Sequence, residues 1–170
     1  MQEIPLRQPA ISELYLMPVS LEMAEAIFPL MSAKICEGLA IKPIESINDV
    51  RHFIKGTDSL QKGRFFIVHH SLGIIGGISF GLINDRERLI TALLSYWVGD
   101  EYQGNGYATT ALSSLMYTLK NQGVTQYLAQ VFPYNIASQK VLKKLGFECL
   151  DPNMYQDGFS GLVDFTLILI

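Results

Sequence analysis

The chain has 170 residues, which fits one domain over residues 1–170 and is long enough to bury a sizeable core. Apolar residues make up 49% and charged residues 17%, which excludes a disordered chain and favours either a generous core or an apolar partner surface, as in a monomer or a homodimer. The formal net charge of -3 gives no general attraction to nucleic acid, so we expect no nucleic-acid partner, and any anion site must be local.

Two serines are placed to begin helices in the first half of the chain. Ser20 precedes an apolar-periodic run that Pro29 trims, and Ser46 with the nearby Asp49 resembles a capping box. Residues 32–45, between these runs, carry no clear pattern. The elements predicted here are a strand over 14–17 and helices from Leu21 to about Met31 and from Ile47 to about Leu60.

The second half predicts strands and helices in alternation. Residues 64–70 and 74–82 form a hairpin whose turn ends at Gly73, and a polar turn over 84–88 follows. The remaining predicted elements are strands over 92–98, 127–131 and 162–170 and helices over 109–121 and 137–145. This order predicts an α/β fold with a mixed sheet.

The cysteines and the chain's apolar stretches bear on metals and on cellular location. Cys36 and Cys149 lack the spacing of a metal site, so we expect no metal and assign both to the core of a protein in a reduced compartment. Residues 1–11 lack the pattern of a secretion signal, and residues 71–84 are too short and too rich in glycine to span a bilayer. We therefore expect a cytoplasmic protein with no membrane partner.

A glycine-rich turn separates the strand over 92–98 from the helix that follows it. A helix start carries backbone N–H groups without intrahelical partners and about half a positive charge. Gly104 and Gly106 have no Cβ, so the backbone there can take left-handed angles and a bulky anion can approach closely. The turn is therefore a candidate phosphate cradle. A plain glycine turn that only leads into the helix is the alternative, and the Gly-x-Gly spacing alone does not decide between them.

Two familiar phosphate motifs do not account for this turn. A P-loop needs a lysine and then a serine or threonine directly after its last glycine, and Gly106 is followed by Tyr107 and Ala108. A dinucleotide fingerprint needs a third small residue and an acid at the end of the next strand. Thr109 holds the first of these places, and the strand ends in Val131 without an acid.

Two signatures resemble those of the GCN5-related N-acetyltransferases. Residues 103–108, Gln-Gly-Asn-Gly-Tyr-Ala, resemble that superfamily's acyl-CoA signature, Gln/Arg-x-x-Gly-x-Gly/Ala. Residues 135–147, which begin with Asn-Ile-Ala-Ser and end in Leu-Gly-Phe, resemble its second signature. The Tyr-Trp pair before the turn and Ser138 are most similar to the branch that contains the ribosomal-protein N-terminal acetyltransferases and the spermidine acetyltransferases.

The resemblance implies a fold and a reaction. The fold is a central mixed, mostly antiparallel β-sheet flanked by helices, with the strands that carry Trp97 and Gln130 splayed at the acyl-CoA site. The reaction is direct transfer of an acetyl group from acetyl-CoA to a primary amine, either a protein N-terminus or a small molecule. A non-catalytic acyl-CoA-binding or sensing domain is the alternative function.

The resemblance also implies the site residues. CoA contacts fall on Trp97, Val98, Gln103, Gly104, Asn105, Gly106, Tyr107, Ala108 and Asn135. Trp97 and Val98 act through their backbone, while the side chains of Tyr96 and Trp97 are ordinary core aromatics, and Asn135 also suits a helix cap. Ser138 is the candidate catalytic acid for the departing thiolate, because Leu142 occupies the place where many relatives carry a tyrosine.

A base for the acceptor amine is not evident. In the ribosomal-protein branch a glutamate usually stands three residues before the strand tyrosine, and here that residue is Leu93. The candidates are water, His69, His70 and Asp85. Adjacent histidines on a strand point to opposite faces, so at most one of them can face the site.

Overall fold

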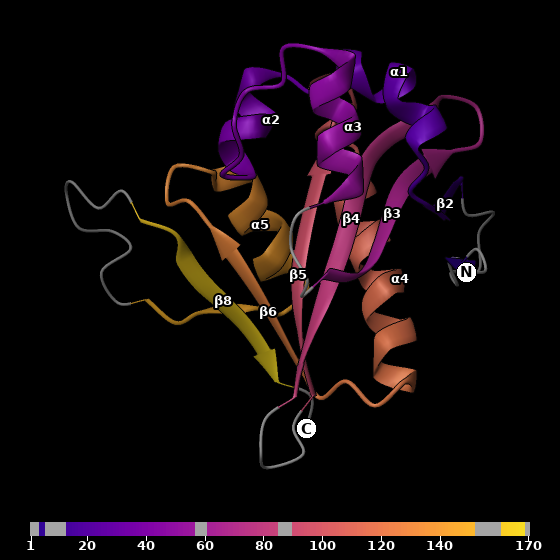
Figure 1. The fold of residues 1–170 in the computed structure, drawn as a ribbon. Helices are drawn as coiled ribbons and strands as arrows, with labels where there is room; N and C mark the ends of the chain where they lie inside the picture. The colour runs from indigo at the N-terminus through magenta and orange to yellow at the C-terminus, as the bar shows by residue number, and fades with distance from the viewer. Residues whose placement is uncertain (1–3, 6–12, 57–60, 85–89, 152–160, 169–170) are drawn as a thin grey trace.

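The computed structural model describes residues 4–5, 13–56, 61–84, 90–151 and 161–168, which form one sheet of eight strands flanked by helices (Figure 1). The strands are β1 (Ile4–Pro5), β2 (Leu14–Pro18), β3 (Gln61–His69), β4 (Gly73–Asn84), β5 (Ile90–Val98), β6 (Gln126–Val131), β7 (Glu148–Cys149) and β8 (Val163–Ile168). Their order in the sheet is β1-β2-β3-β4-β5-β6-β8-β7. Every neighbouring pair is antiparallel except β5 and β6, so the mixed, mostly antiparallel sheet predicted from the sequence is confirmed.

The helices divide between the two faces of the sheet. They are α1 (Ala24–Ile27) with 3-10 turns at Leu21–Met23 and Phe28–Leu30, α2 (Ala33–Gly38), α3 (Ile47–Lys55), a 3-10 turn at Asp100–Tyr102, α4 (Tyr107–Asn121) and α5 (Ile136–Lys144). In β3, Phe65 and Ile67 belong to the core under α4 and α5, whereas Phe66 and Val68 belong to the core under α1–α3. Because successive side chains of a strand point to opposite faces of the sheet, β3 contributes residues to both cores.

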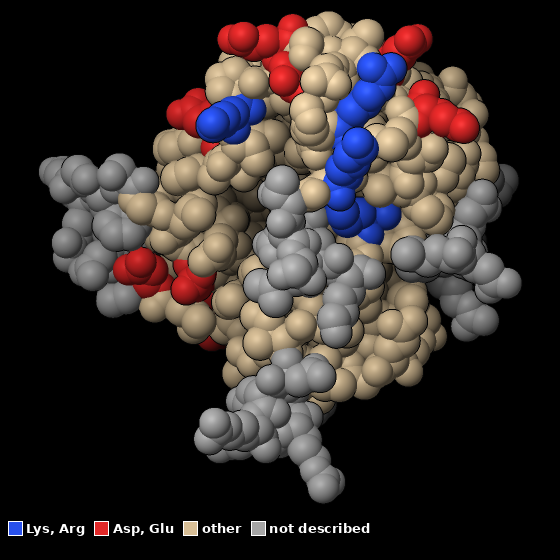
Figure 2. Space-filling view, in the orientation of Figure 1, with Lys and Arg blue, Asp and Glu red and all other residues tan. Residues whose placement is uncertain are grey.

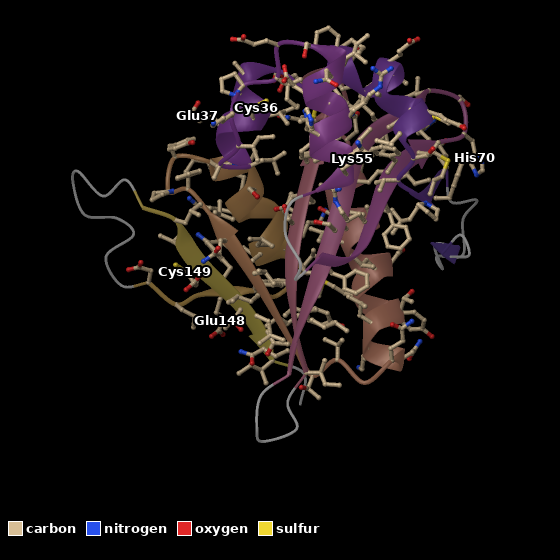
Figure 3. The ribbon with its side chains drawn as sticks, viewed as in Figure 1. Cys36, Glu37, Lys55, His70, Glu148 and Cys149 are labelled. Atoms are coloured by element: carbon tan, nitrogen blue, oxygen red, sulfur yellow. The ribbon has the colours of Figure 1, made fainter. Side chains whose placement is uncertain are left out.

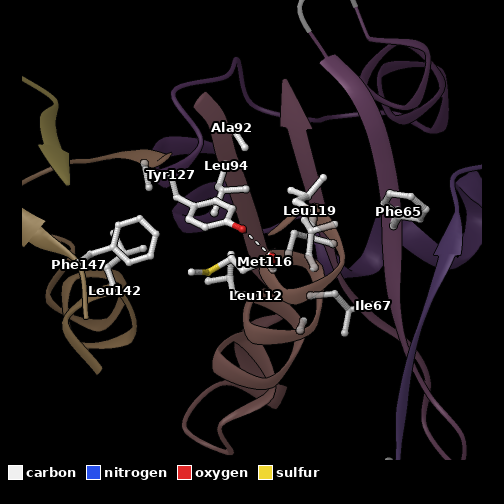
Figure 4. Packing of buried hydrophobic residues seen from close by; sticks show 14 of the residues in the cluster. Phe65, Ile67, Ala92, Leu94, Leu112, Met116, Leu119, Tyr127, Leu142 and Phe147 are labelled. Carbon is white, nitrogen blue, oxygen red and sulfur yellow. Dashed lines mark hydrogen bonds between the residues drawn. The ribbon is translucent and has the colours of Figure 1, made fainter. Parts of the chain in front are cut away.

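Tyr127 anchors the core under α4 and α5 (Figure 4). Its side chain is fully buried, and its hydroxyl donates to the carbonyl oxygen of Met116 at 2.5 Å. Burial raises the pKa of Tyr127 to about 12. The bond ties β6 to α4.

The sheet opens between β5 and β6. The two strands pair only from Thr91 with Gln126 to Leu94 with Ala129, although β5 continues to Val98 and β6 to Val131. The last residues of both strands therefore diverge, as Figure 1 shows. The predicted splay of these strands is confirmed.

The first half differs from its sequence prediction in three places. The predicted helix to about Leu60 is wrong at its end, because α3 stops at Lys55, where Gly56 takes a φ of 68°. Residues 32–45, without a clear pattern, contain α2, which begins when Ser32 Oγ accepts the Ile35 N–H at 3.2 Å. The predicted helix from Leu21 is a series of short 3-10 and α-helical turns rather than one regular helix.

Other predictions fall partly outside the described residues or were not made. The end of the predicted helix falls on residues 57–60, which lie outside the described ranges. Most of the predicted turn over 84–88 and the end of the predicted strand over 162–170 also lie outside them. The sequence predicts neither β1 nor β7, each of which has two residues.

The cysteines, the possible metal ligands and the character of the helices all enter the sequence prediction. Cys36 on α2 is buried, and Cys149 on β7 is half-buried with its Sγ donating to the Asp151 carbonyl at 3.6 Å (Figure 3). Within the described ranges, no group of histidine, cysteine and acidic side chains could hold a metal ion. Among the helices described, none combines the length and apolar character that a membrane crossing requires.

Candidate functional site

A cavity of about 840 Å³ lies where β5 and β6 diverge. Its walls come from the end of β5, the turn into α4, the end of β6, the start of α5, and α2. This volume is within the range of about 300–1,000 Å³ that is typical of small-molecule sites. Of the residues predicted to contact CoA, all but Asn105 line it, and Ser138 lines it as well.

The glycine turn forms one end of the cavity. Gly104 and Gly106 have φ values of 79° and 80°, and a Cβ built on either would meet no atom within 4 Å. The first intrahelical bond of α4 runs from the Thr110 N–H to the Gly106 carbonyl at 3.0 Å. The N–H groups of Tyr107, Ala108 and Thr109 therefore precede the first helical bond and have no helical carbonyl to meet. This geometry suits an anion.

The polar side chains of the turn shape it from within. Gln103 Nε2 donates to the Val98 carbonyl at 2.9 Å and to Asp100 Oδ1 at 3.3 Å. Asn105 Nδ2 donates to the carbonyls of Tyr102 and Gln103 at 3.1 and 3.2 Å. Gln103 thus holds the turn against the end of β5 and Asn105 closes the turn on itself, while Gly104 and Gly106 line the cavity.

The backbone of β5 presents alternate residues to the opening. The Gly99 N–H points toward β4, where it donates to the Ile75 carbonyl at 2.8 Å. Because backbone groups alternate in direction along a strand, those of Val98 and Tyr96 point the other way, toward the space between β5 and β6. The Trp97 backbone faces Gly77 of β4. Its indole is buried in the core under α1–α3, as predicted for a core aromatic.

The side chain of Tyr96 has a different position from the one predicted. Its ring packs at the edge of the core under α4 and α5, but its hydroxyl lies 2.5 Å from Ser138 Oγ and donates to the Ser138 carbonyl at 3.2 Å. Both residues line the cavity. Burial raises the pKa of Tyr96 to about 12, against the smaller opposing effect of the Ser138 hydrogen bond. The alternation of β5 already separates Tyr96 from Trp97, but it does not reveal a partner on α5.

The start of α5 is fixed by Asn135. Asn135 Oδ1 accepts the Ser138 N–H at 3.2 Å, so its side chain is a helix cap, one of the two roles that its sequence position suggests. Leu142, which stands where many relatives carry a tyrosine, is fully buried. Among the described residues that line the cavity, Lys34, Lys140 and Lys144 are the basic side chains and Glu37 on α2 is the carboxylate (Figure 3).

Neither candidate histidine base lines the cavity. His69 is buried, with Nε2 3.2 Å from Glu13 Oε2 and Nδ1 accepting the N–H groups of Ser71 and Leu72. His70 packs against the ring of Tyr15 at 5.1 Å between centroids. Leu93 lines the cavity but cannot take a proton. Asp85 lies outside the described residues.

A second, smaller cavity of about 110 Å³ adjoins the first. The two share Leu39, Ser95 and Trp97 as lining residues. Ser79 also lines the smaller cavity, and it stands directly opposite Ser95 in the register of β4 and β5. The smaller cavity therefore lies beside the main one, and several of its lining residues belong to the core under α1–α3.

Comparisons with known proteins identify the family and the fold. Residues 13–148 match the acetyltransferase (GNAT) domain family. The ribosomal-protein-serine acetyltransferase of Escherichia coli K12 is 28% identical over 108 residues, which are 61% of this chain and 59% of that protein. The chain thus matches less than two thirds of this relative's length.

Solved structures share the fold at low identity. RimL, a ribosomal L7/L12 alpha-N-protein acetyltransferase solved with CoA, gives a TM-score of 0.78 at 21% identity and covers 99% of this chain and 98% of its own. A Salmonella typhimurium acetyltransferase that modifies the N-terminal serine of L7/L12 gives 0.77 at 20% identity, over 99% of this chain and 100% of that one. The microcin C7 self-immunity acetyltransferase MccE, solved with acetyl-CoA and AMP, gives 0.74 at 21% identity, over 92% and 93%.

Proposed function

The chain belongs to the acetyltransferase (GNAT) family, and we propose that it transfers an acetyl group from acetyl-CoA directly to a primary amine. One observation carries the proposal. A single cavity joins a helix start with free N–H groups, a strand end with backbone groups turned toward the opening, and the hydroxyl of Ser138. These are the features needed to hold a phosphate, an amide chain and a thioester in one extended ligand.

Each part of acetyl-CoA would meet a different element. The turn at Gly104 and Gly106 would take the pyrophosphate, with Lys140 and Lys144 on the adjacent wall. The backbone of Tyr96 and Val98 would hydrogen-bond to the pantetheine amides much as an added strand does. Trp97 and Val98 are the residues that the family resemblance indicates, but the alternation of β5 favours Tyr96 over Trp97.

The chemistry requires no covalent enzyme intermediate. The acceptor nitrogen forms a bond to the acetyl carbon, the carbon–sulfur bond breaks, and the thiolate takes a proton while the nitrogen loses one to water. A thiolate of this kind has a pKa of about 8.5, so a hydrogen bond from Ser138 helps it to leave without full proton transfer. Most of the rate would come from positioning the two reactants.

The acceptor is a protein N-terminus or a small-molecule amine. The matching Escherichia coli protein is named for acetylation of a ribosomal-protein serine, which supports a peptide with an N-terminal serine as the first acceptor to test. The smaller cavity beside Ser95 offers space for the group that carries the amine. Leu93 leaves this side without the family carboxylate, so we expect the amine to arrive neutral or to lose its proton to water.

A non-catalytic CoA-binding domain is the second candidate, because Leu93 and Leu142 replace two residues that relatives use in catalysis. A panel of amines separates the two functions. The panel contains a peptide with an N-terminal serine, spermidine and free amino acids, and the readout is release of free thiol from acetyl-CoA. Turnover with any amine supports the enzyme. Tight CoA binding with no turnover across the panel supports the sensor.

A further inference from the structure

We propose that Tyr96 is a positioning residue that orients the Ser138 hydroxyl toward the sulfur of the bound thioester, an inference that rests on the proposed function. The two side chains come from different elements, β5 and α5, and meet at 2.5 Å between their oxygens. Both line the main cavity. The phenol also donates to the Ser138 carbonyl at 3.2 Å, so it contacts Ser138 at both its side chain and its backbone.

The donors and acceptors of the two hydroxyls determine which of them donates to the other. The Tyr96 hydroxyl and the Ser138 hydroxyl each have one proton, and each can also accept. The phenol, with a pKa of about 12, keeps its proton throughout the neutral range. As negative charge develops on the departing sulfur, the Ser138 proton turns toward the sulfur and Ser138 Oγ becomes the acceptor of the Tyr96 proton. The result is a chain of two hydrogen bonds that run from Tyr96 through Ser138 to the sulfur.

This chain strengthens only as the thiolate forms. Linked hydrogen bonds polarise one another, and a bond to a charged group is stronger than a neutral one. Tyr96 should therefore stabilise the transition state more than the bound substrate, which affects kcat rather than KM. A purely structural role, in which the phenol pins α5 to β5, would instead affect CoA affinity or folding and would not depend on the Ser138 hydroxyl.

A double-mutant cycle tests the inference. Tyr96→Phe, Ser138→Ala and the double variant are compared with the unchanged chain by steady-state kinetics with the best amine of the panel. We expect Tyr96→Phe to lower kcat about tenfold, the size of one hydrogen bond between neutral groups, with little change in KM for acetyl-CoA. We expect it to have no further effect once Ser138 is alanine. An equal loss in both backgrounds would show that Tyr96 acts without Ser138 and would overturn the inference.

Tyr127→Phe is the matched control. Tyr127 is also a tyrosine with a raised pKa whose hydroxyl donates to a backbone carbonyl at 2.5 Å, but it is not among the residues that line the cavity. This change should lower thermal stability and leave kcat unaltered. A loss of kcat in Tyr127→Phe as large as that in Tyr96→Phe would assign the effect to altered packing and contradict the inference.

The ionisation of bound CoA gives a readout that needs no acceptor. Ultraviolet absorbance follows thiolate formation in the complex with CoA. We expect the thiol pKa of bound CoA to lie below that of free CoA, and to rise in Tyr96→Phe and in Ser138→Ala without a further rise in the double variant. Such coupling without turnover would support the inference while the proposed transfer fails. If the protein turns over but Tyr96→Phe does not change the thiol pKa of bound CoA, the inference is contradicted and the proposed function stands. Failure to bind CoA would overturn both.

Discussion

Tyr96 and Trp97 are neighbours in sequence but serve opposite sides of the sheet. Trp97 covers Gly77 of β4, where an added Cβ would lie 2.4 Å from the indole Nε1, so the absence of a side chain at Gly77 makes room for the ring. Tyr96 turns to the other face and reaches α5. The alternation of side chains along β5 therefore places one aromatic residue in a core and its neighbour at the cavity.

Gly106 is where the anion cradle can be tested directly. Gly106→Val should abolish CoA binding, because its side chain would project from a φ of 80° into space that no protein atom occupies within 4 Å and that we assign to the pyrophosphate. Isothermal titration with CoA measures the loss. A folded variant with unchanged affinity would mean that the turn is only structural.

Gly73→Val separates this effect from backbone strain. Gly73 has a φ of 76° and also has nothing within 4 Å of an added Cβ, but it is the first residue of β4 and does not line the cavity. Both variants strain the backbone by about 1–3 kcal/mol. We expect Gly106→Val and Gly73→Val to lose similar amounts of stability. Only Gly73→Val should still bind CoA.

At the scale of elements, α3 follows local rules that can be seen in the sequence. Ser46 Oγ accepts the Asp49 N–H at 3.1 Å, while Asp49 Oδ2 accepts the Glu45 N–H at 3.1 Å and the Ser46 hydroxyl at 2.8 Å. These bonds hold the pKa of Asp49 below its ordinary value. At its other end, the Arg64 guanidinium donates to the carbonyls of Ile54 and Phe53, so a residue of β3 caps the last turn.

Removal of the Ser46 cap should destabilise the fold without affecting the site. Ser46→Ala should lower the free energy of unfolding by about 1 kcal/mol, because the Asp49 N–H loses its acceptor. Chemical denaturation measures this change, and CoA affinity should stay the same. Ser20→Ala is the control, since its cap bond to Glu22 N is 3.4 Å long, and we expect a smaller loss.

Since the lowered pKa of Asp49 favours its charged form, the stability that Asp49 contributes is present at neutral pH and is lost as the pH falls through that pKa.

Local signals predicted the longer strands and most helices, and several of the errors have local causes too. Gly56, a visible stop signal, ends α3, and extending the helix to about Leu60 overlooks it. The six residues of α2 are too few for a helical period, so burial of Ile35 and Cys36 against the rest of the core sustains this helix. The contact of Tyr96 with Ser138 joins residues 42 positions apart, and no local pattern could predict it. The left-handed conformation of Gly104 and Gly106, by contrast, depends only on the local backbone, so the sequence is enough to predict it.

For the molecule as a whole, our proposal places acetyl-CoA and the acceptor at different parts of the sheet. The turn and α5 form the side where we place CoA, and several residues of the core under α1–α3 line the smaller cavity. Uncharged surface covers most of the face drawn in Figure 2, with acidic side chains along its upper rim and at its lower left, and a row of basic side chains near its centre. The absence of a histidine or cysteine among the described cavity residues then controls how the reaction should depend on pH.

Turnover should rise with pH along the ionisation of the acceptor amine itself. His69 and His70 stand outside the cavity, and Tyr96 keeps its proton until a pH of about 12, so no described residue that lines the cavity is expected to add an inflection near the usual histidine pKa of about 6.5. The measurement is kcat/KM for the acceptor across the neutral and alkaline range. For a peptide α-amine the midpoint should lie near 7.7–8.0, and for an alkyl amine such as a lysine side chain it should lie near 10.4.

Two acceptors of different pKa make this prediction specific to the amine. If the acceptor alone titrates, the midpoint moves with the acceptor and stays in place in His69→Ala and His70→Ala. A midpoint near 6.5 that is shared by both acceptors and lost in either histidine variant would identify a histidine as the base. It would also require that the histidine leave the contacts with Glu13 or Tyr15 that it makes in this structure.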